Sequence, residues 1–359
     1  MNPDLSRFAA RLRGLIADSQ SVIRDSHFSE LALELFTLQF RHNHAYRKIC
    51  EARNLTPTTV EQWTQIPAVP AAAFKELELS SIPAAARTAV FHSSGTTEQK
   101  PSRHFHCAES LSVYEASLWT WFKRNCGMQN ADCGLVILTP PPERVPHSSL
   151  VHMFETVRKR IGAPETVFTG QLADDGAWTL DFEAAMTALS DNSKLKTQNS
   201  KLILGAAFSF VHLLDFLAEK KLRLRLPALS RVMETGGYKN RSRSLPKAEL
   251  HALITERLGV PRENIVCEYG MSELSSQAYA KSAGAFQFPP WARAQIISPE
   301  TGCEVAEGET GLIRIFDLAN VFSVAAIQTE DLGIRRGDGF ELVGRAQLAE
   351  PRGCSLMTA

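Results

Sequence analysis

The chain has 359 residues, 44% hydrophobic and 22% charged, a composition typical of a folded globular protein with room for a large core and two structural units. Its 39 basic and 39 acidic residues cancel, so the net charge does not favour nucleic acid or an anionic membrane surface as a partner. Arg7, Arg11, Arg13 and Asp18 interrupt the N-terminus, and no run of about 18 apolar residues follows. We therefore expect a cytoplasmic protein with no membrane span.

Residues 1–80 are predicted to form a helical N-terminal region. Apolar residues recur at helical spacing within residues 4–50, in a stripe that begins with Phe8 and Leu12. Prolines then divide the chain into short turns before a helical piece over residues 71–77.

Residues 88–100 are predicted to form a short apolar strand that ends in a phosphate-binding loop. The loop combines several hydroxyls, a glycine that lets the backbone approach a ligand, and a terminal positive charge. Its candidate anion-binding residues are Ser93, Ser94, Gly95, Thr96, Thr97 and Lys100. The spacing differs from G-x-x-x-x-G-K-[ST], and no G-x-G-x-x-G follows a strand, which argues against kinase-like P-loops and Rossmann dehydrogenases. An ordinary solvated loop is the alternative interpretation.

Residues 81–290 are predicted to form an α/β core of buried strands that alternate with helices. After Lys100 the pattern predicts a core-facing helix, with Leu111, Tyr114, Leu118 and Phe122 at spacings of three and four. The polar stretch over residues 190–202 is expected to be a surface loop without a role in chemistry. The predicted strands are residues 134–139, 201–207, 231–235 and 265–269.

One helix of this core is marked at both ends by its sequence. Ser244 can cap it, Pro246 fits its first turn, and Leu250 and Ile254 belong to its apolar stripe. Gly259 is expected to end it.

Candidate binding groups follow two of the predicted strands. His147 lies in the loop after the first strand, and loops at the carboxyl ends of strands are common binding positions. A structural histidine is the alternative. Gly236 and Gly237, followed by Tyr238, would let the backbone press against a flat or charged ligand. A plain tight turn is the alternative there.

The stretch Tyr269-Gly270-Met271-Ser272-Glu273 turns sharply away from the end of the last core strand. A hydroxyl and a carboxylate that leave one turn suit a magnesium-bound triphosphate, because Mg²⁺ takes oxygen ligands and commonly one or two protein carboxylates. A glutamate in a solvated turn is the alternative.

Glycine-punctuated alternating segments predict a small β-rich subdomain over residues 291–345, followed by an aperiodic tail over residues 346–359. Asp331 lies in Thr-Glu-Asp-Leu-Gly, and Arg345 closes the last hairpin-like segment. The seven cysteines lack the spacing of a zinc site, and most are expected to be small buried residues. Cys354 differs because it lies in the tail, where its pattern alone favours an inert cysteine.

Four stretches in this order resemble the signature of the acyl-adenylate-forming superfamily: Ser-Ser-Gly-Thr-Thr, Gly-Gly-Tyr, Tyr-Gly-Met-Ser-Glu, and Thr-Glu-Asp-Leu-Gly with a later Gly-Arg. The phrase Phe-His-Ser-Ser-Gly-Thr-Thr, the short chain and the cysteine near its end resemble most closely the acyl-protein synthetases, the fatty-acid-activating component of the luminescence fatty-acid reductase. The resemblance implies an α/β fold of the adenylate-forming N-terminal-domain type, with layered subdomains. It also leads us to expect that the usual mobile C-terminal domain, with its lysine, has no counterpart.

The resemblance implies a role for each matching residue. The loop hydroxyls and Lys100 would hold the β- and γ-phosphates of ATP, and Glu273 would ligate Mg²⁺. His147 would lie next to the acyl carboxylate. The remaining nucleotide contacts would come from Gly236, Gly237, Tyr238, Tyr269, Gly270, Ser272, Asp331 and Arg345.

The implied activity is ATP-dependent conversion of a carboxylic acid, expected to be a long-chain fatty acid, to acyl-AMP. The thiol of Cys354, beside Arg352, would then take the acyl group as a thioester for a reductase or another acceptor protein, because nearby positive charge favours the thiolate. An acyl-CoA ligase of the phenylacetate type and a non-catalytic nucleotide-binding subunit are the competing interpretations.

Overall fold

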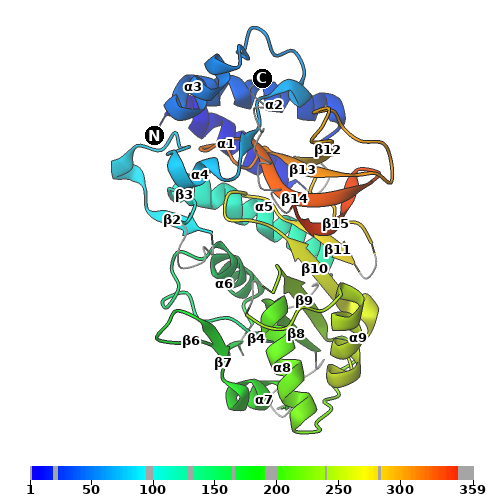
Figure 1. Ribbon diagram of the computed structural model, residues 1–359. Coiled ribbons are helices and arrows are strands. Elements are labelled where there is room, and N and C mark those ends of the chain that lie inside the picture. The colour runs from blue at the N-terminus through cyan, green and yellow to red at the C-terminus, as the bar shows by residue number, and fades with distance from the viewer. Residues whose placement is uncertain are drawn as a thin grey trace, which may run out of the picture.

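The computed structural model describes residues 2–18, 23–93, 100–127, 133–163, 166–190, 200–238, 241–281 and 284–346. Figure 1 shows a six-stranded sheet in its lower half, a five-stranded sheet in its upper half, and helix α5 (Ala108–Cys126) crossing between them. The predicted mixed α/β architecture is confirmed.

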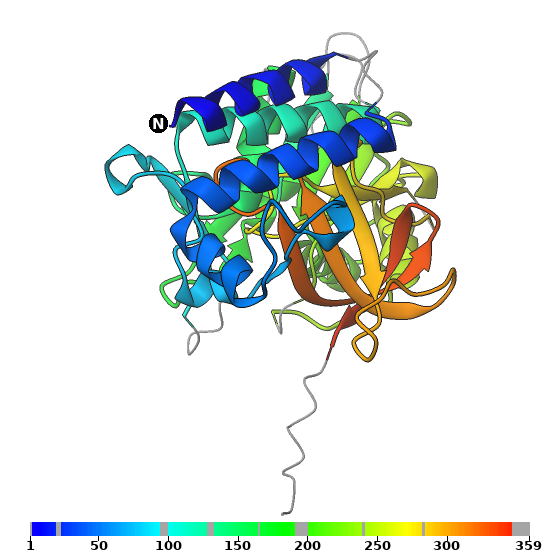
Figure 2. The ribbon, with the colours of Figure 1, turned by 90° about the horizontal axis from the view of Figure 1, so that it is seen from above.

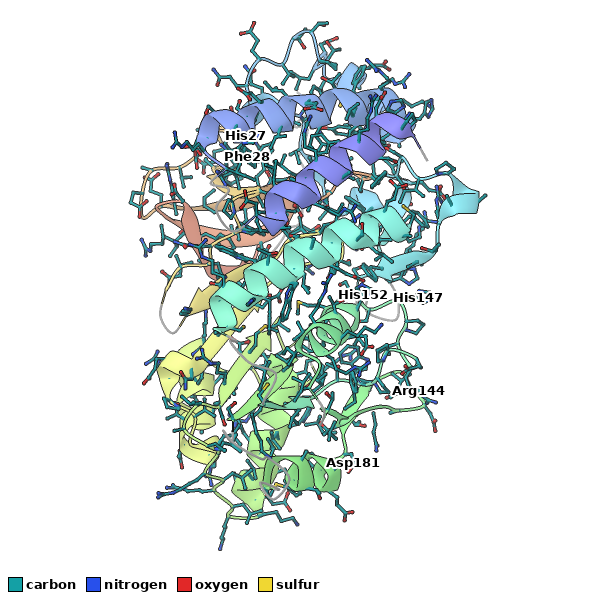
Figure 3. The ribbon with its side chains drawn as sticks, turned by 180° about the vertical axis from the view of Figure 1, so that it is seen from behind. His27, Phe28, Arg144, His147, His152 and Asp181 are labelled. Carbon is teal, nitrogen blue, oxygen red and sulfur yellow. The ribbon has the colours of Figure 1, made fainter. Side chains whose placement is uncertain are left out.

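Three helices open the chain, as the apolar stripes over residues 4–50 predict: α1 (Pro3–Ala17), α2 (Asp25–His42) and α3 (His44–Ala52). The side chain of Asn2 caps α1 by accepting the backbone N–H groups of Asp4 and Leu5. Figure 2 shows α1, α2 and α5 running side by side, and Figure 3 shows α1 between the other two. Among the described residues, no helix has the length and the apolar content needed to cross a bilayer.

The six-stranded sheet forms the centre of the α/β core. Its strand order is β11-β10-β9-β8-β4-β5, with β11 antiparallel to β10 and the other neighbours parallel. The predicted core strands are confirmed, although β8 begins inside the stretch expected to be a loop. The strands are β4 (Cys133–Ile137), β5 (Thr166–Phe168), β8 (Ser200–Ala206), β9 (Arg231–Thr235), β10 (Ile265–Tyr269) and β11 (Ala278–Lys281).

Helices cover both faces of this sheet, which is why β4, β8, β9 and β10 are buried in nearly every position. Leu202 and Leu204 pack into the core shared with α5 and α6 (Ser149–Ile161), whereas Ile203 packs toward the opposite face. That opposite face carries α7 (Phe182–Ser190), α8 (Ala207–Glu219) and α9 (Lys247–Leu258).

Helix α9 ends as predicted but begins later. Gly259 adopts the left-handed conformation, with a φ of 69°, and closes the helix with its N–H on the carbonyl of Thr255. Pro246 is the N-cap, so Pro246 lies just outside the first turn and Ser244 is not the cap. The predicted start was wrong because Pro246 has a non-helical backbone, with a ψ of 140°, so the helix begins only after it.

The β-rich region predicted from residue 291 is confirmed as four strands of the upper sheet. These are β12 (Ala292–Ile297), β13 (Thr310–Asp317), β14 (Ala326–Arg336) and β15 (Gly339–Arg345). The order β1-β14-β13-β12, with β15 also on β14, includes the short β1 (Val69–Pro70) from the N-terminal region. The proposed domain boundaries at residues 80, 290 and 345 stay predictions.

Two hairpins complete the fold. The predicted strand before the hydroxyl-rich loop is β2 (Ala89–His92), and it pairs with β3 (Arg103–His106), which was not predicted. His104 and His106 are buried and alternate with partly buried neighbours, so their burial follows a strand period. The predicted helix after Lys100 is confirmed as α5, which begins after β3. The remaining elements are β6 (Gly170–Leu172) paired with β7 (Trp178–Leu180), helix α4 (Ala73–Glu76) and the 3₁₀ turns Trp63–Gln65, Ala84–Ala86 and Arg262–Asn264.

Candidate active site

The carboxyl ends of β9 and β10 bring two of the predicted motifs together. The strands are parallel neighbours, with Glu268 in register with Thr235, so Gly236 and Gly270 leave the sheet at the same edge. Gly236 has a φ of 69°, and a Cβ on Gly236 or Gly237 would meet nothing within 4 Å. This open backbone lies at the edge where doubly wound sheets bind ligands.

A hydrogen-bonded chain connects the base of the hydroxyl-rich loop with the turn after β10. Ser93 Oγ accepts the backbone N–H of Ser102 at 3.0 Å, and Ser102 Oγ lies 3.3 Å from Ser272 Oγ. The Ser272 hydroxyl donates to Glu273 Oε2 at 3.0 Å. Ser102 and Ser272, which are 170 residues apart in the sequence, therefore belong to one buried hydrogen-bonded network.

Several side chains that the sequence did not single out hold this turn. His104 Nδ1 lies 2.9 Å from the backbone carbonyl of Ser272, and Asn320 donates to the carbonyl of Glu273 at 2.9 Å. Asp317, fully buried, accepts the N–H groups of Ser275 and Ser276 at 2.9 and 2.7 Å. These partners come from distant segments, so spacing along the chain carried no signal for them.

A second group lies between β10 and β14. The Tyr269 hydroxyl donates to Asp331 Oδ2 at 2.8 Å, and Arg345 Nε lies 3.6 Å from Asp331 Oδ1 across the β14–β15 ladder. Burial raises the pKa of Asp331, while the Tyr269 hydrogen bond and Arg345 oppose that rise. The structure thus brings together three residues that the sequence assigned to one ligand.

Beneath these groups, Glu268 joins the ends of β9 and β10. Its carboxylate accepts the hydroxyl of Thr235, and burial raises the pKa of Glu268 to about 7. A Cβ on Gly270 would lie 2.4 Å from Glu268 Oε1, so a larger residue at position 270 would displace that carboxylate. Glycine at position 270 therefore lets the turn sit directly over this carboxylate.

Lys100 and His147 lie at the outer side of the β2–β3 hairpin. Lys100 Nζ forms an exposed ion pair with Glu76 at 3.2 Å. The exposed His147 ring stacks on His92 at a centroid separation of 4.8 Å, and its Nδ1 lies 3.2 Å from the carbonyl of Val90 (Figure 3). His147 thus lies against β2, the strand that leads into the hydroxyl-rich loop, whereas Lys100 contacts α4.

Other predicted residues are less closely tied to this group. The Tyr238 hydroxyl donates to the carbonyl of Leu245 at 2.8 Å, which turns it toward the start of α9. Five of the sequence candidates lie outside the described residues: Ser94, Gly95, Thr96, Thr97 and Cys354.

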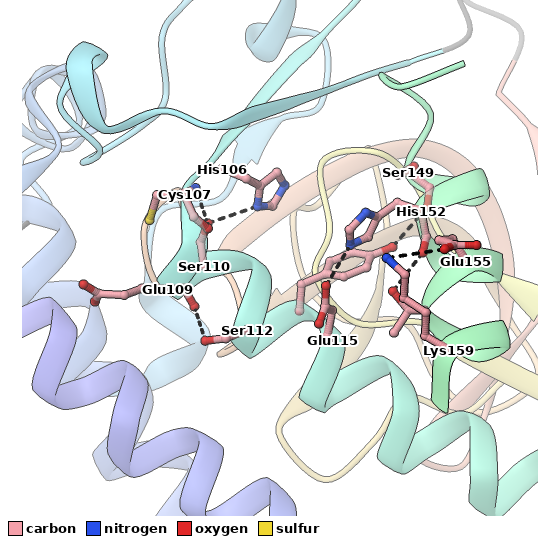
Figure 4. Close-up of polar contacts among 12 residues, drawn as sticks. His106, Cys107, Glu109, Ser110, Ser112, Glu115, Ser149, His152, Glu155 and Lys159 are labelled. Carbon is pink, nitrogen blue, oxygen red and sulfur yellow. Dashed lines mark hydrogen bonds and ion pairs between the residues drawn. The ribbon is translucent and has the colours of Figure 1, made fainter. Parts of the chain in front are cut away.

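A group of buried and partly buried polar side chains on β3, α5 and α6 was not predicted. Figure 4 shows His106 beside Ser110, at 3.2 Å, and His152 beside Glu115, at 3.3 Å. His106 Nε2 is buried without a hydrogen-bond partner in the described part of the chain. The hydrogen bond from His152 is the main cause that lowers the pKa of Glu115. These groups place polar atoms inside an otherwise apolar layer behind β2 and β3.

Solved structures with this fold define its class. A 2-hydroxyisobutyryl-CoA ligase in an open conformation, in complex with 2-HIB-AMP and CoA, aligns with a TM-score of 0.67 at 14% identity, over 90% of this chain and 75% of that chain. The same ligase in its postadenylation state with 2-HIB-AMP also gives 0.67, over 90% and 68%. The fold is that of the adenylate-forming ligases.

Sequence comparison narrows the class to a family. The family model described as "Acyl-protein synthetase, LuxE" matches residues 8–359, so the chain belongs to the acyl-protein synthetase family and is a ligase. A long-chain-fatty-acid–luciferin-component ligase of Aliivibrio fischeri is 25% identical over 95% of this chain and 89% of its own length. One of Vibrio harveyi is 24% identical over 91% and 86%. The resemblance inferred from the motifs is confirmed.

Proposed function

We propose that the chain uses ATP to convert a carboxylic acid to acyl-AMP at the shared edge of β9 and β10. The observation that carries this proposal is the hydrogen-bonded chain from Ser93 through Ser102 and Ser272 to Glu273. It joins a hydroxyl-rich loop to a carboxylate, the combination that a metal-bound triphosphate needs. Family membership and the ligase fold support the same reaction.

The nucleotide would lie across the groups described above. Its β- and γ-phosphates would contact the hydroxyl-rich loop, and its ribose hydroxyls would donate to Asp331 beside Tyr269 and Arg345. The adenine would lie over Gly236 and Gly237, where the backbone leaves open space on one side.

Glu273 fits a magnesium ligand by its chemistry. Its carboxylate is buried, it lies beside the Ser272 hydroxyl, and Mg²⁺ commonly takes one or two carboxylates together with substrate phosphates. When bound, Mg²⁺ supplies positive charge that offsets the charge developing on the phosphates.

In the proposed reaction, a carboxylate oxygen of the acid forms a bond to the α-phosphorus as the bond from that phosphorus to the bridging oxygen breaks. The electron pair leaves with pyrophosphate. Lys100 would stabilise this leaving group, because its exposed pair with Glu76 holds it only weakly in its present position. His147 would orient the acid from the outer side of the hairpin.

The proposed second step is transfer of the acyl group to the thiol of Cys354. The thiolate would attack the acyl carbon, and AMP would leave with the anhydride oxygen. A long-chain fatty acid as substrate is suggested by the names of the Aliivibrio fischeri and Vibrio harveyi relatives. A reductase as acceptor is suggested by the resemblance of the motifs and the tail to the acyl-protein synthetases.

Acid-dependent exchange of labelled pyrophosphate into ATP tests the first step, with a panel of acids of increasing chain length. We expect exchange with at least one acid. ATP binding without exchange for any acid would instead support a non-catalytic nucleotide-binding subunit.

The Cys354→Ser variant tests the second step separately. We expect exchange to continue while the hydroxylamine-sensitive acyl-enzyme disappears. An acyl-enzyme at the wild-type level would contradict the assignment of Cys354, and CoA-dependent release of an acyl thioester by this variant would favour an acyl-CoA ligase.

A further inference from the structure

A cluster of three metal-ligating side chains lies one layer below the candidate active site. Glu234 of β9 and Cys267 of β10 are in register on neighbouring strands, and His251 of α9 meets them. Figure 1 shows α9 lying along these two strands. All three side chains are buried. The three residues are 15 or more positions apart in the sequence, so only the fold brings their carboxylate, imidazole and thiol together.

The separations of the donor atoms are close to those around a tetrahedral zinc ion. His251 Nε2 lies 3.4 Å from Glu234 Oε1 and 3.4 Å from Cys267 Sγ. Ligands at ordinary zinc distances would be about 3.4–3.6 Å apart. Cys267 Sγ lies only 2.6 Å from Glu234 Oε1, as expected for a thiol that donates to a carboxylate. A change of side-chain rotamer that moves the Glu234 carboxylate by about 1 Å would lengthen the Sγ–Oε1 distance to that expected for two ligands of one zinc ion.

The buried carboxylate of Glu234 is a group that a cation at this position would stabilise. Burial is the main cause that raises the pKa of Cys267, so without a metal the thiol stays protonated and donates to that carboxylate. Lys247 also faces the thiol and opposes that rise. A divalent cation would balance one thiolate and one carboxylate while the imidazole stays neutral.

The surroundings of His251 leave it without a complete set of protein partners. The side chain is fully buried, and its Nδ1 has no hydrogen-bond partner within the part of the chain that the structure describes. A buried imidazole normally uses both nitrogens. A metal on one nitrogen and a water on the other would satisfy both.

We propose that Glu234, His251 and Cys267 bind a structural zinc ion. The fourth tetrahedral position would be taken by a water or by the second oxygen of Glu234. The ion would join β9, β10 and α9 directly beneath the turns that begin at Gly236 and Gly270. It would therefore hold those two turns at a constant separation without contacting the substrates.

Metal content of the full chain tests this proposal, independently of any activity. The protein is produced without a polyhistidine tag, dialysed against buffered Zn²⁺ and then against metal-free buffer, and analysed by inductively coupled plasma mass spectrometry. We expect about one zinc ion per chain. Replacement with Co²⁺ should give the near-ultraviolet absorption of a thiolate-bound cobalt ion.

Matched cysteine variants separate this cluster from general thiol binding. Cys126, like Cys267, is a buried cysteine, but it belongs to no metal-ligating group among the described residues. Cys126→Ser should keep its zinc, whereas Cys267→Ser and His251→Ala should lose it by at least about tenfold. Glu234→Gln, which keeps the shape of the side chain, covers the case in which either of these two variants fails to fold.

Two results would overturn the proposal. One is wild-type protein that retains no stoichiometric zinc or cobalt after dialysis. The other is equal metal content in Cys126→Ser and the cluster variants, with circular dichroism showing that all are folded. In either case the cluster is a hydrogen-bonded network of thiol, imidazole and carboxylate.

Discussion

The two ends of the candidate active site are built differently. The turn at Ser272 and Glu273 is buried, and Ser102, His104 and Asn320 contact it from two other segments. At the other end, Asp331 is partly exposed, and the side chain of Arg345, its ion-pair partner, is 78% exposed.

Because of this difference in burial, we expect the two ends of the site to contribute differently to catalysis and to nucleotide binding. A buried turn held by several hydrogen bonds resists displacement, so its carboxylate can stay in place while charge develops on a bound phosphate. An exposed pair across a hairpin costs little to rearrange and suits a ligand that enters and leaves. Substitutions at the buried end should therefore affect chemistry or folding, whereas those at the exposed end should affect nucleotide binding.

The largest effect is expected from Glu273→Gln. Loss of the charge should lower acid-dependent pyrophosphate exchange by at least about 100-fold and raise the Mg²⁺ concentration needed for half-maximal exchange. Glu256→Gln, on the exposed face of α9, is the control and should exchange at the wild-type rate. Unchanged exchange by Glu273→Gln at low Mg²⁺ would show that the metal is held elsewhere.

The next effect concerns folding of the same end. Asp317→Ala leaves the N–H groups of Ser275 and Ser276 without their acceptor, and should lower the free energy of unfolding by about 2–3 kcal/mol. Urea unfolding measures this change. Asp317→Asn keeps an acceptor and should cost less. Equal losses for the two variants would mean that the charge, not the acceptor, fixes the turn.

Sequence patterns predicted the elements better than the contacts between them. Short apolar runs identified the core strands, because a sheet covered on both faces buries successive residues. Helical spacing of apolar residues identified the opening helices, because burial of one helix face imposes a period along the chain. The same reasoning missed β3, where His104 and His106 supply the buried positions. Histidine is not counted as apolar, so its burial left no hydrophobic period.

The candidate active site was predictable only as a set of separate motifs. Ser272, Glu273 and Asp331 stand in recognisable stretches, but Asp317 and Asn320 do not, because their roles depend on how the upper sheet folds over the turn. The cysteines had no zinc spacing for the same reason. Cys267 meets its partners through strand pairing and helix packing, which the linear sequence does not encode locally.

A smaller effect should appear at Glu268, whose carboxylate joins the ends of β9 and β10. Its folded-state pKa of about 7 lies above the ordinary 4.5, so the folded protein binds more protons than the unfolded chain between these pH values. This residue's contribution to stability is therefore greatest below pH 4.5 and falls as the pH rises through about 7.

Glu268→Gln should remove that dependence. The variant should be more stable than the wild type by on the order of 2 kcal/mol at about pH 8, and the difference should shrink by about pH 5. Urea unfolding at several pH values measures it, with Glu256→Gln as the surface control. A constant difference across this range would mean that Glu268 does not titrate within it.

The smallest effect is expected at the exposed end, where Asp331→Asn should weaken nucleotide binding without disturbing the turn. Loss of the carboxylate should raise the KM for ATP by about tenfold while kcat changes less than about twofold, because two hydrogen bonds to a ribose contribute about that much. The free energy of unfolding should change by less than about 1 kcal/mol, since the side chain is only partly buried. A deoxyribose analogue of ATP supplies the matched control: the wild type should bind it about tenfold more weakly than ATP, and the variant should bind both equally. If Asp331→Asn still binds the analogue more weakly than ATP, another residue contacts the ribose hydroxyls. The assignment of ribose binding to the exposed end of the site would then be wrong.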